Sequence, residues 1–117
     1  MAIRIVKDRI SRTELKVLSG ESPAGAVKVV ADLDKKVLGI GGPMHRDIEI
    51  VLLSDGASLH NLWGFSLYPD RPWENAFEFR SHVNIRPQDG NHSIQIQDKK
   101  LCDLLVALAA ARIDWKC

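Results

Sequence analysis

The sequence has 117 residues, of which 45% are hydrophobic, and its 16 lysines and arginines nearly balance 15 aspartates and glutamates. This length suits one domain with its own hydrophobic core, so we predict a single domain over residues 1–117. A formal net charge of +1 argues against proteins whose affinity for nucleic acid depends on neutralising many phosphates. We therefore do not expect a nucleic-acid partner.

The sequence predicts neither an N-terminal signal peptide nor a membrane span. The N-terminus lacks the apolar core of a signal peptide, and the longest apolar run, residues 104–111, is too short to cross a bilayer. The two cysteines, Cys102 and Cys117, are too few for a disulfide framework and lack the spacing of a zinc site. We expect a cytoplasmic protein with free thiols and no membrane partner.

The first elements in chain order are a short strand and a helix. Residues 3–6 have the pattern of a strand. Ser11 and Glu14 form a capping box, in which each residue satisfies a free backbone N–H group of the other at a helix start. Gly20 is a residue type that commonly ends helices. We therefore predict a helix between Ser11 and Gly20.

Two β-hairpins are predicted in the middle of the chain. Residues 27–33 and 37–40 are apolar segments around a polar break, which is typical of a hairpin. Residues 48–53 and 59–67 form the second pair, joined across the turn signal Asp55-Gly56.

The first strand of the second hairpin has a competing interpretation. Pro43 could occupy the first turn of a short helix that runs to Leu53. We favour the strand because Ile48, Ile50 and Val51 would lose rotamer freedom in a helix.

The last third of the chain predicts a long strand, a shorter strand and a final helix. Residues 77–86 alternate apolar and polar side chains, and residues 93–97 return after a turn. Asp98 has the character of a helix N-cap, and four leucines then share one helical stripe: Leu101, Leu104, Leu105 and Leu108. We predict an α+β fold with an antiparallel sheet of six or seven strands and an N-terminal and a C-terminal helix packed on one face.

Four motifs resemble those shared by a family of small prokaryotic proteins of unknown function. The family motifs are G-G-x-x-H-x-D-x-E, D-G-S, W-G-x-x-x-Y-P and N-I-R-P, which correspond here to Gly41–Glu49, Asp55–Ser58, Trp63–Pro69 and Asn84–Pro87. In two departures, Ala57 splits the glycine–serine pair and Ser66 stands where asparagine is expected. The resemblance spans nearly the whole chain. It implies a stand-alone cytoplasmic protein without an attached catalytic domain, and it brings no activity with it.

His45, Asp47 and Glu49 are candidate metal ligands. If this segment is a strand, the three alternate side chains project from one face. An imidazole and two carboxylates could ligate Mg²⁺, Mn²⁺ or Zn²⁺, so a divalent metal is the candidate cofactor although no cofactor motif is evident. The competing interpretation is a charged strand edge that discourages pairing with other sheets.

Arg80, His82, Asn84 and Arg86 are candidate ligand-binding residues on one face of the predicted long strand. Arginine has a planar fork of donors that matches phosphate and carboxylate groups, so these residues suit a small anionic ligand. The alternatives are a solvent-facing side of the sheet and surface ion pairs with Asp47 or Glu49. A pocket that joins both sets of residues is the sharpest hypothesis, and it requires the two strands to be neighbours.

The three tryptophans have different predicted roles. Trp63 lies in a strand and is predicted to belong to the core. Trp73 lies in a proline-bounded loop and Trp115 near the C-terminus, so both are candidates for exposed surface. Because exposed tryptophans often mark an interface, a homodimer is a candidate assembly.

Two functions remain open at this point. The favoured hypothesis is a small cytoplasmic binding or protein-interaction module. The alternative is a metal-dependent hydrolase acting on a phosphate or other anionic substrate, in which His45, Asp47 and Glu49 hold the metal and Arg80 or Arg86 neutralises substrate charge. The sequence contains no P-loop, dinucleotide-binding glycine motif or nucleophile elbow that would favour another enzyme class.

Overall fold

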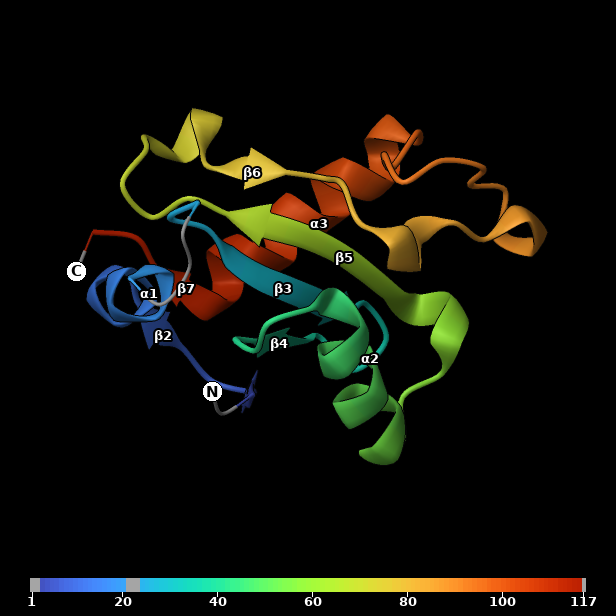
Figure 1. Ribbon diagram of the computed structural model, residues 1–117, viewed down its shortest axis with the longest axis horizontal. Helices are drawn as coiled ribbons and strands as arrows, with labels where there is room; N and C mark the ends of the chain where they lie inside the picture. Colours follow the sequence, from blue (N-terminus) through green and yellow to red (C-terminus); the bar gives the residue numbers. More distant parts are fainter. Residues whose placement is uncertain (1–2, 21–23, 117) are drawn as a thin grey trace.

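A five-stranded sheet lies between helices in the computed structural model, which describes residues 3–20 and 24–116 (Figure 1). The strands are β1 (Arg4–Val6), β2 (Ile10–Ser11), β3 (Val27–Asp32), β4 (Val37–Ile40), β5 (Leu62–Leu67), β6 (Phe77–Glu78) and β7 (Ile113–Asp114). The α-helices are α1 (Arg12–Ser19), α2 (His45–Ser54) and α3 (Lys99–Arg112). Four short 3₁₀ helices are η1 (Leu59–Asn61), η2 (Trp73–Asn75), η3 (His82–Asn84) and η4 (Pro87–Asp89).

The large sheet is antiparallel and has the strand order β1-β4-β3-β5-β6. The predicted hairpin of β3 and β4 is confirmed, with Val29 opposite Ile40. The mixed α+β class is also confirmed, but this sheet has five strands rather than six or seven. A separate parallel pair joins β2 to β7, and the sequence pattern contains no sign of this pairing because the two strands lie at opposite ends of the chain.

Both terminal helices begin with the predicted caps. The Ser11 side chain accepts a hydrogen bond from the Glu14 N–H group, and the Asp98 side chain accepts one from Lys100. Helix α1 ends at Ser19, with Gly20 as its C-cap. The predicted leucine stripe of α3 is correct only in part, because Leu104 is 58% exposed.

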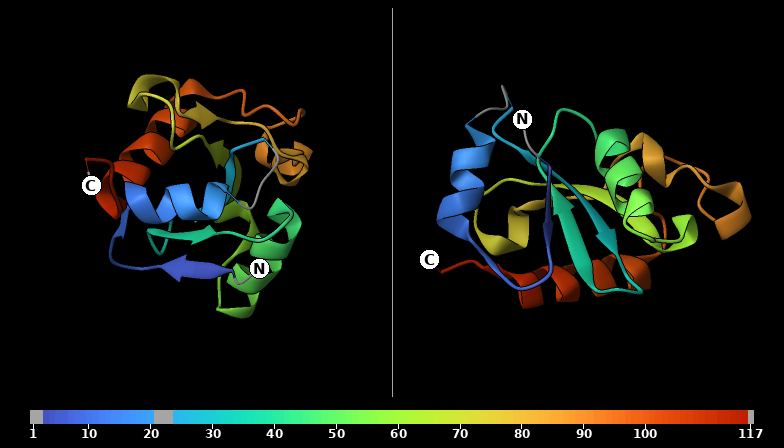
Figure 2. Two further views of the ribbon diagram at one scale, coloured as in Figure 1. Left: turned by 60° about the vertical axis from the view of Figure 1, so that its left-hand side comes forward. Right: turned by 90° about the horizontal axis from the view of Figure 1, so that it is seen from below.

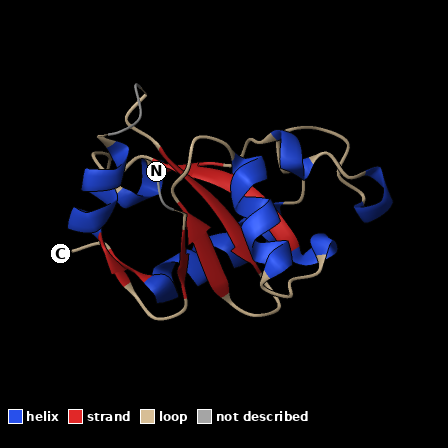
Figure 3. Cartoon of the chain, turned by 60° about the horizontal axis from the view of Figure 1, so that its bottom comes forward, coloured by secondary structure: helices blue, strands red, loops and turns tan. Residues whose placement is uncertain are grey.

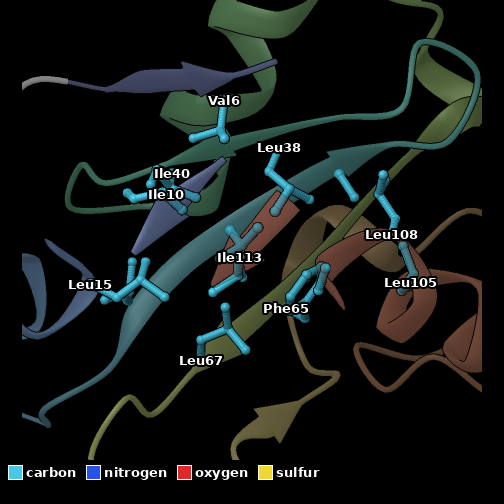
Figure 4. Packing of buried hydrophobic residues seen from close by; sticks show 14 of the residues in the cluster. Val6, Ile10, Leu15, Leu38, Ile40, Phe65, Leu67, Leu105, Leu108 and Ile113 are labelled. Atoms are coloured by element: carbon cyan, nitrogen blue, oxygen red, sulfur yellow. The ribbon is translucent and has the colours of Figure 1, made fainter. Parts of the chain in front are cut away.

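The main core lies on the side of the sheet that α3 covers (Figure 4). Helix α3 runs along this face, whereas α1 lies at one end of the sheet (Figures 1 and 2). Trp63 is 5% exposed and belongs to this core, as predicted. The central buried side chains come from β4, β5, α1 and α3: Leu38, Ile40, Phe65, Leu67, Leu15, Leu105 and Leu108.

Helix α2 replaces the strand predicted over residues 48–53, so the competing helical interpretation is the correct one. It lies on the opposite side of the sheet from α3 (Figures 2 and 3). Its Ile48 and Leu52 pack with Val30 in a second buried cluster. Burial of this kind outweighs the few tenths of a kcal/mol by which β-branched residues disfavour a helix. The buried positions recur at the helical period: His45, Ile48, Glu49 and Leu52.

The alternating residues 77–86 do not form a long strand. Strand β6 ends at Glu78, and beyond it only isolated bridges remain, Arg80 with Gln95 and Arg86 with Asn91. The strand predicted over residues 93–97 is therefore also wrong. The chain instead folds into η3, which contacts β5, and then into η4 farther from the sheet (Figure 1).

The prediction that Trp73 and Trp115 are exposed is wrong, because both are partly buried against each other. Their ring centroids lie 5.1 Å apart, and the Arg12 guanidinium lies 4.6 Å from the Trp115 ring. The homodimer stays a prediction without this support.

Within the described residues, none of the helices is long and apolar enough to span a membrane. Cys117 lies outside the described residues.

Candidate functional site

Two glycines allow α2 and η3 to pack directly on the sheet. Gly39 of β4 and Gly64 of β5 both lie opposite Val30 of β3. A Cβ atom on Gly39 would come within 2.5 Å of the Ile48 Cγ2 atom of α2. A Cβ atom on Gly64 would come within 2.7 Å of the Val83 Cγ2 atom of η3. Glycine, which has no side chain, is therefore required at both positions.

A cleft between α2 and the segment 80–88 contains two adjoining cavities. Figure 2 shows these two parts of the chain side by side on one side of the sheet, where α2 contacts η3. The cavities have volumes of 380 Å³ and 490 Å³, and they share four lining residues: Met44, Arg46, His82 and Val83. We call the smaller one the cationic cavity and the larger one the Glu49 cavity.

The cationic cavity is lined by more positive than negative side chains. Lys28 lies opposite Ser66 on adjacent strands and both line it. Three permanent cations face one carboxylate, so the cavity favours a negatively charged ligand. The charged and titratable side chains are Lys28, His45, Arg46, Glu78, Arg80 and His82.

His45 is buried at the boundary between α2 and the sheet. Its Nε2 atom lies 2.7 Å from the Phe65 carbonyl oxygen, which can only accept, so Nε2 carries the proton. Burial lowers the pKa of His45, and the positive charge of Lys28 lowers that pKa further. The imidazole is therefore neutral at pH 7, and its Nδ1 atom is left as a hydrogen-bond acceptor in a residue that lines the cavity.

The N-terminus of α2 adds positive potential to the same cavity. Its N-cap residue Met44 makes no side-chain capping bond, and no described residue accepts a hydrogen bond from the His45 or Arg46 N–H group. Free N–H groups of a first turn, together with the helix dipole, attract anions. All three residues line the cationic cavity.

Arg86 is buried beside the Glu49 cavity and is held in place by the backbone. It is 4% exposed, and its terminal nitrogens donate to the carbonyl oxygens of Leu59 and Leu62. Its guanidinium carbon lies 4.0 Å from the centre of the Trp63 ring. The Nε atom has no hydrogen-bond partner, and the nearest carboxylate oxygen, from Asp89, lies 3.8 Å away.

Glu49 is a buried carboxyl group in the same cavity. It is 7% exposed, and its side chain makes no hydrogen bond with any described residue. Burial raises the pKa of Glu49, and the charges of Arg46 and Arg86 oppose that rise. The desolvation of a carboxylate is expensive without a hydrogen-bonding partner.

Asn84 has a structural role in the edge of the sheet. Its Oδ1 atom accepts from the Gly64 N–H group, and its Nδ2 atom donates to the Gly64 carbonyl, both at 2.8 Å. The Nδ2 atom also donates to the Ile94 carbonyl at 3.2 Å. The amide thus takes the place of a neighbouring strand at β5. Because its hydrogen-bonding atoms are engaged inside the protein, we do not place Asn84 in the site.

The other predicted site residues are redistributed by α2 and η3. His45 and Glu49 are one helical turn apart on the cleft side, whereas Asp47 is rotated by about 200° from His45. The common face predicted for these three residues is therefore wrong, and the proposal of a shared metal loses its geometric basis. No group of three or more His, Cys, Asp or Glu side chains in residues 3–20 and 24–116 is arranged to hold a metal ion. Arg80 and His82 do lie near His45, in the cationic cavity.

Two cations of the site were missed by the sequence analysis. Lys28 is the one charged residue inside the apolar segment 26–31, and an isolated charge in a buried strand is a signal that could have marked it. Arg46 lies within the motif Gly41–Glu49, but the predicted strand would have directed it away from His45. The helical period instead places it in the lining of both cavities.

Comparison with known proteins gives a family but no activity. The family model described as "Protein of unknown function (DUF5674)" matches residues 4–111. No curated protein and no solved structure matches the chain. The family match covers nearly the full sequence and agrees with the predicted membership of a family of unknown function. This chain therefore belongs to the DUF5674 family.

Proposed function

We propose that this protein is a small ligand-binding module that holds the phosphate or carboxylate group of a small molecule in the cationic cavity. The observation that carries the proposal is the convergence of Lys28, Arg46 and Arg80 on one cavity of 380 Å³. These cations come from β3, α2 and the segment after β6, so the fold brings together charges that are far apart in the sequence. Such convergence is what recognition of an anion requires.

The individual contributions to binding are small and act together. An exposed ion pair contributes about 0–1 kcal/mol, and a helix N-terminus adds about 0.3–1 kcal/mol toward an anion. At the upper ends of these two ranges, three cations and the free N–H groups of α2 together contribute about 4 kcal/mol, which corresponds to a Kd on the order of 1 mM for inorganic phosphate. Contacts to the rest of a larger ligand would add to this affinity.

The test is a titration of inorganic phosphate followed by thermal unfolding. A ligand that binds the folded state raises the Tm with concentration, so we expect phosphate to raise the Tm above that in sodium chloride of equal ionic strength. The variants Arg46→Gln and Arg80→Gln should each weaken phosphate binding by up to about fivefold, because each loses an exposed ion pair worth up to about 1 kcal/mol.

Lys99→Gln is the matched control for these variants. It removes one positive charge from a side chain that is 89% exposed on α3, on the other side of the sheet (Figure 1). It should leave phosphate binding unchanged. Equal Tm values in phosphate and chloride, or an equal loss in Lys99→Gln, would refute an anion site in this cavity.

The remaining functional predictions have no further observation in their favour. The metal-dependent hydrolase stays a prediction, and the position of Asp47, about 200° around α2 from His45, adds no support to it. The cytoplasmic location, the protein-interaction role and the homodimer stay predictions.

A further inference from the structure

The Glu49 cavity contains a buried carboxyl group without a partner. Glu49 is 93% enclosed, since only 7% of its surface is exposed, and no described residue donates a hydrogen bond to it. Buried carboxylates normally accept several hydrogen bonds or are paired with a cation. Its oxygens are not among the atoms that are completely shielded from solvent. An acceptor pair is therefore open toward the cavity that Glu49 lines.

Arg86 does not supply the missing donors. Its terminal nitrogens are already bound to the Leu59 and Leu62 carbonyl groups, and its planar group is stacked on Trp63. It acts on Glu49 through charge alone. The arrangement keeps a positive charge near the carboxyl group and leaves the carboxyl oxygens available to another molecule.

Part of the lining of the Glu49 cavity is apolar and exposed, beside the polar residues Arg46, His82 and Gln88. Met44, Leu59 and Ile85 line it, and they are 56%, 41% and 45% exposed, respectively. Exposed apolar side chains around a polar centre are typical of small-molecule sites, where they cover the ligand body while a few polar groups orient it. The ligand part that enters this cavity should therefore be mostly apolar and carry hydrogen-bond donors.

We propose that the Glu49 cavity recognises paired N–H donors on the organic part of a phosphate monoester whose phosphate occupies the cationic cavity. The two oxygens of a carboxylate accept two parallel N–H donors, as they do from arginine. A flat heterocycle with adjacent N–H groups, of the guanine type, presents that pair on an otherwise apolar surface. Arg46 lines both cavities and marks the junction between phosphate and heterocycle. The proposal rests on the proposed function, because it uses the cationic cavity for the phosphate.

The first measurement compares two phosphate monoesters by isothermal titration calorimetry. Guanosine 5′-monophosphate carries the paired N–H donors, and ribose 5-phosphate has the same phosphate and sugar without them. We expect the nucleotide to bind the wild-type protein at least tenfold more tightly. Equal affinities would overturn the role of the Glu49 cavity and leave the anion site standing. Absence of binding by both compounds would overturn both proposals.

The second measurement uses Glu49→Gln, which replaces one acceptor oxygen by an NH₂ donor of the same size. This variant should bind guanosine 5′-monophosphate no more tightly than ribose 5-phosphate. Its Tm without ligand should equal or exceed that of the wild type, because the unpartnered charge is gone. Glu74→Gln, at an exposed position of η2, is the matched control and should keep the wild-type preference. A preference retained in Glu49→Gln, or a large drop in its Tm, would assign Glu49 a structural role and contradict the proposal.

Discussion

Gly39 and Gly64 occupy the same row of the sheet, two strands apart, with one residue of β3 between them. Neighbouring strands are about 4.8 Å apart, so the two glycines are separated by roughly 10 Å of rigid backbone. Gly39 allows α2 to pack on the sheet, and Gly64 allows η3 to do so. The distance between the two walls of the cleft is therefore determined by the sheet, and the site residues on both walls are positioned before any ligand binds.

Alanine at either glycine should destabilise the protein. The new Cβ atom would lie 2.5 Å from the Ile48 Cγ2 atom in Gly39→Ala and 2.7 Å from the Val83 Cγ2 atom in Gly64→Ala. Forcing a methyl group into a packed region typically costs about 1–3 kcal/mol. We expect losses of this size in the free energy of unfolding measured with urea.

A double-mutant cycle can show whether the loss of stability in Gly39→Ala comes from the clash with Ile48 or from a change in strand propensity. In an Ile48→Ala background the clashing Cγ2 atom is absent, so Gly39→Ala should lose most of its effect. Gly39→Ala should keep its full effect in a Val83→Ala background, which serves as the control pair. Additive effects of Gly39→Ala and Ile48→Ala would show that close packing of α2 does not explain the glycine.

Asn84→Ala should be among the most destabilising single substitutions in the protein. It removes three hydrogen bonds and leaves the N–H and carbonyl groups of Gly64 without their Asn84 partners. Each unsatisfied buried group costs about 1–3 kcal/mol, so the free energy of unfolding should fall by about 3 kcal/mol. Asn75→Ala, at an exposed position of η2, should change it by about 0.5 kcal/mol or less. Similar values for the two variants would show that the Asn84 amide does not replace a strand.

Because of His45, the free energy of unfolding should decrease as the pH falls below neutral. Burial lowers its folded-state pKa below the ordinary value of 6.5, so the unfolded chain takes up the proton first. The free energy of unfolding therefore falls as the pH drops from about 6.5 toward the lower folded-state pKa. The raised pKa of Glu49 acts in the opposite direction, since stability from its protonated form is lost as the pH rises through that pKa.

Urea unfolding of His45→Gln and wild type between pH 7.5 and 5 isolates the histidine, because Glu49 is present in both proteins. The variant should lose less stability on acidification than the wild type. His60→Gln, at an exposed position, should follow the wild-type curve. An unchanged slope in His45→Gln would mean that the imidazole is not held neutral by its surroundings.

Arg12→Lys should weaken the contact between α1, the loop after β5 and the C-terminal segment. The Arg12 Nε atom donates to the Pro69 carbonyl at 2.7 Å and its Nη2 atom to the Arg71 carbonyl at 3.0 Å, while the guanidinium lies over Trp115. Lysine has no planar fork with which to make these contacts together. We expect a loss of about 1–2 kcal/mol and a change in tryptophan fluorescence.

The control is Arg4→Lys, whose ion pair with Glu14 is half exposed. Exposed pairs contribute about 0–1 kcal/mol, so this variant should be close to the wild type in stability and fluorescence. If Arg12→Lys behaves in the same way, the stacked arginine does not join these segments.

The parts of the fold that could be predicted from sequence are those whose cause is local. The side chains of Ser11 and Asp98 cap helices within three residues of themselves, and the hairpin of β3 and β4 has its polar turn in the sequence. Helix α2 was rejected in favour of a strand because of its β-branched residues, and its apolar pattern gave little support for a helix because His45 and Glu49 occupy two of its four buried positions. Polar residues at these positions hide a helical period in the apolar pattern, and they belong to the candidate site.

The alternating pattern of residues 77–86 wrongly predicted a strand, and the reason is different. A strand pattern assumes that backbone groups pair with a neighbouring backbone, but here side chains of Asn84 and Arg86 bind the backbone of other segments. Whether side chains take the place of a neighbouring strand depends on which segments meet in space, and the sequence pattern does not contain that information. The meeting of α2 with η3, and hence the pairing of the two cavities, is of the same kind.

The parallel pair of β2 and β7 has a consequence for the order in which the protein can fold. Ile10 pairs with Ile113, so translation must add roughly 100 residues between the two partners, which takes about 5–20 s at typical ribosomal rates. During that interval the side chain of Ile10, which is 1% exposed in the finished molecule, lacks its final cover. The native fold is therefore completed only once the ribosome has released the last turn of α3 and strand β7.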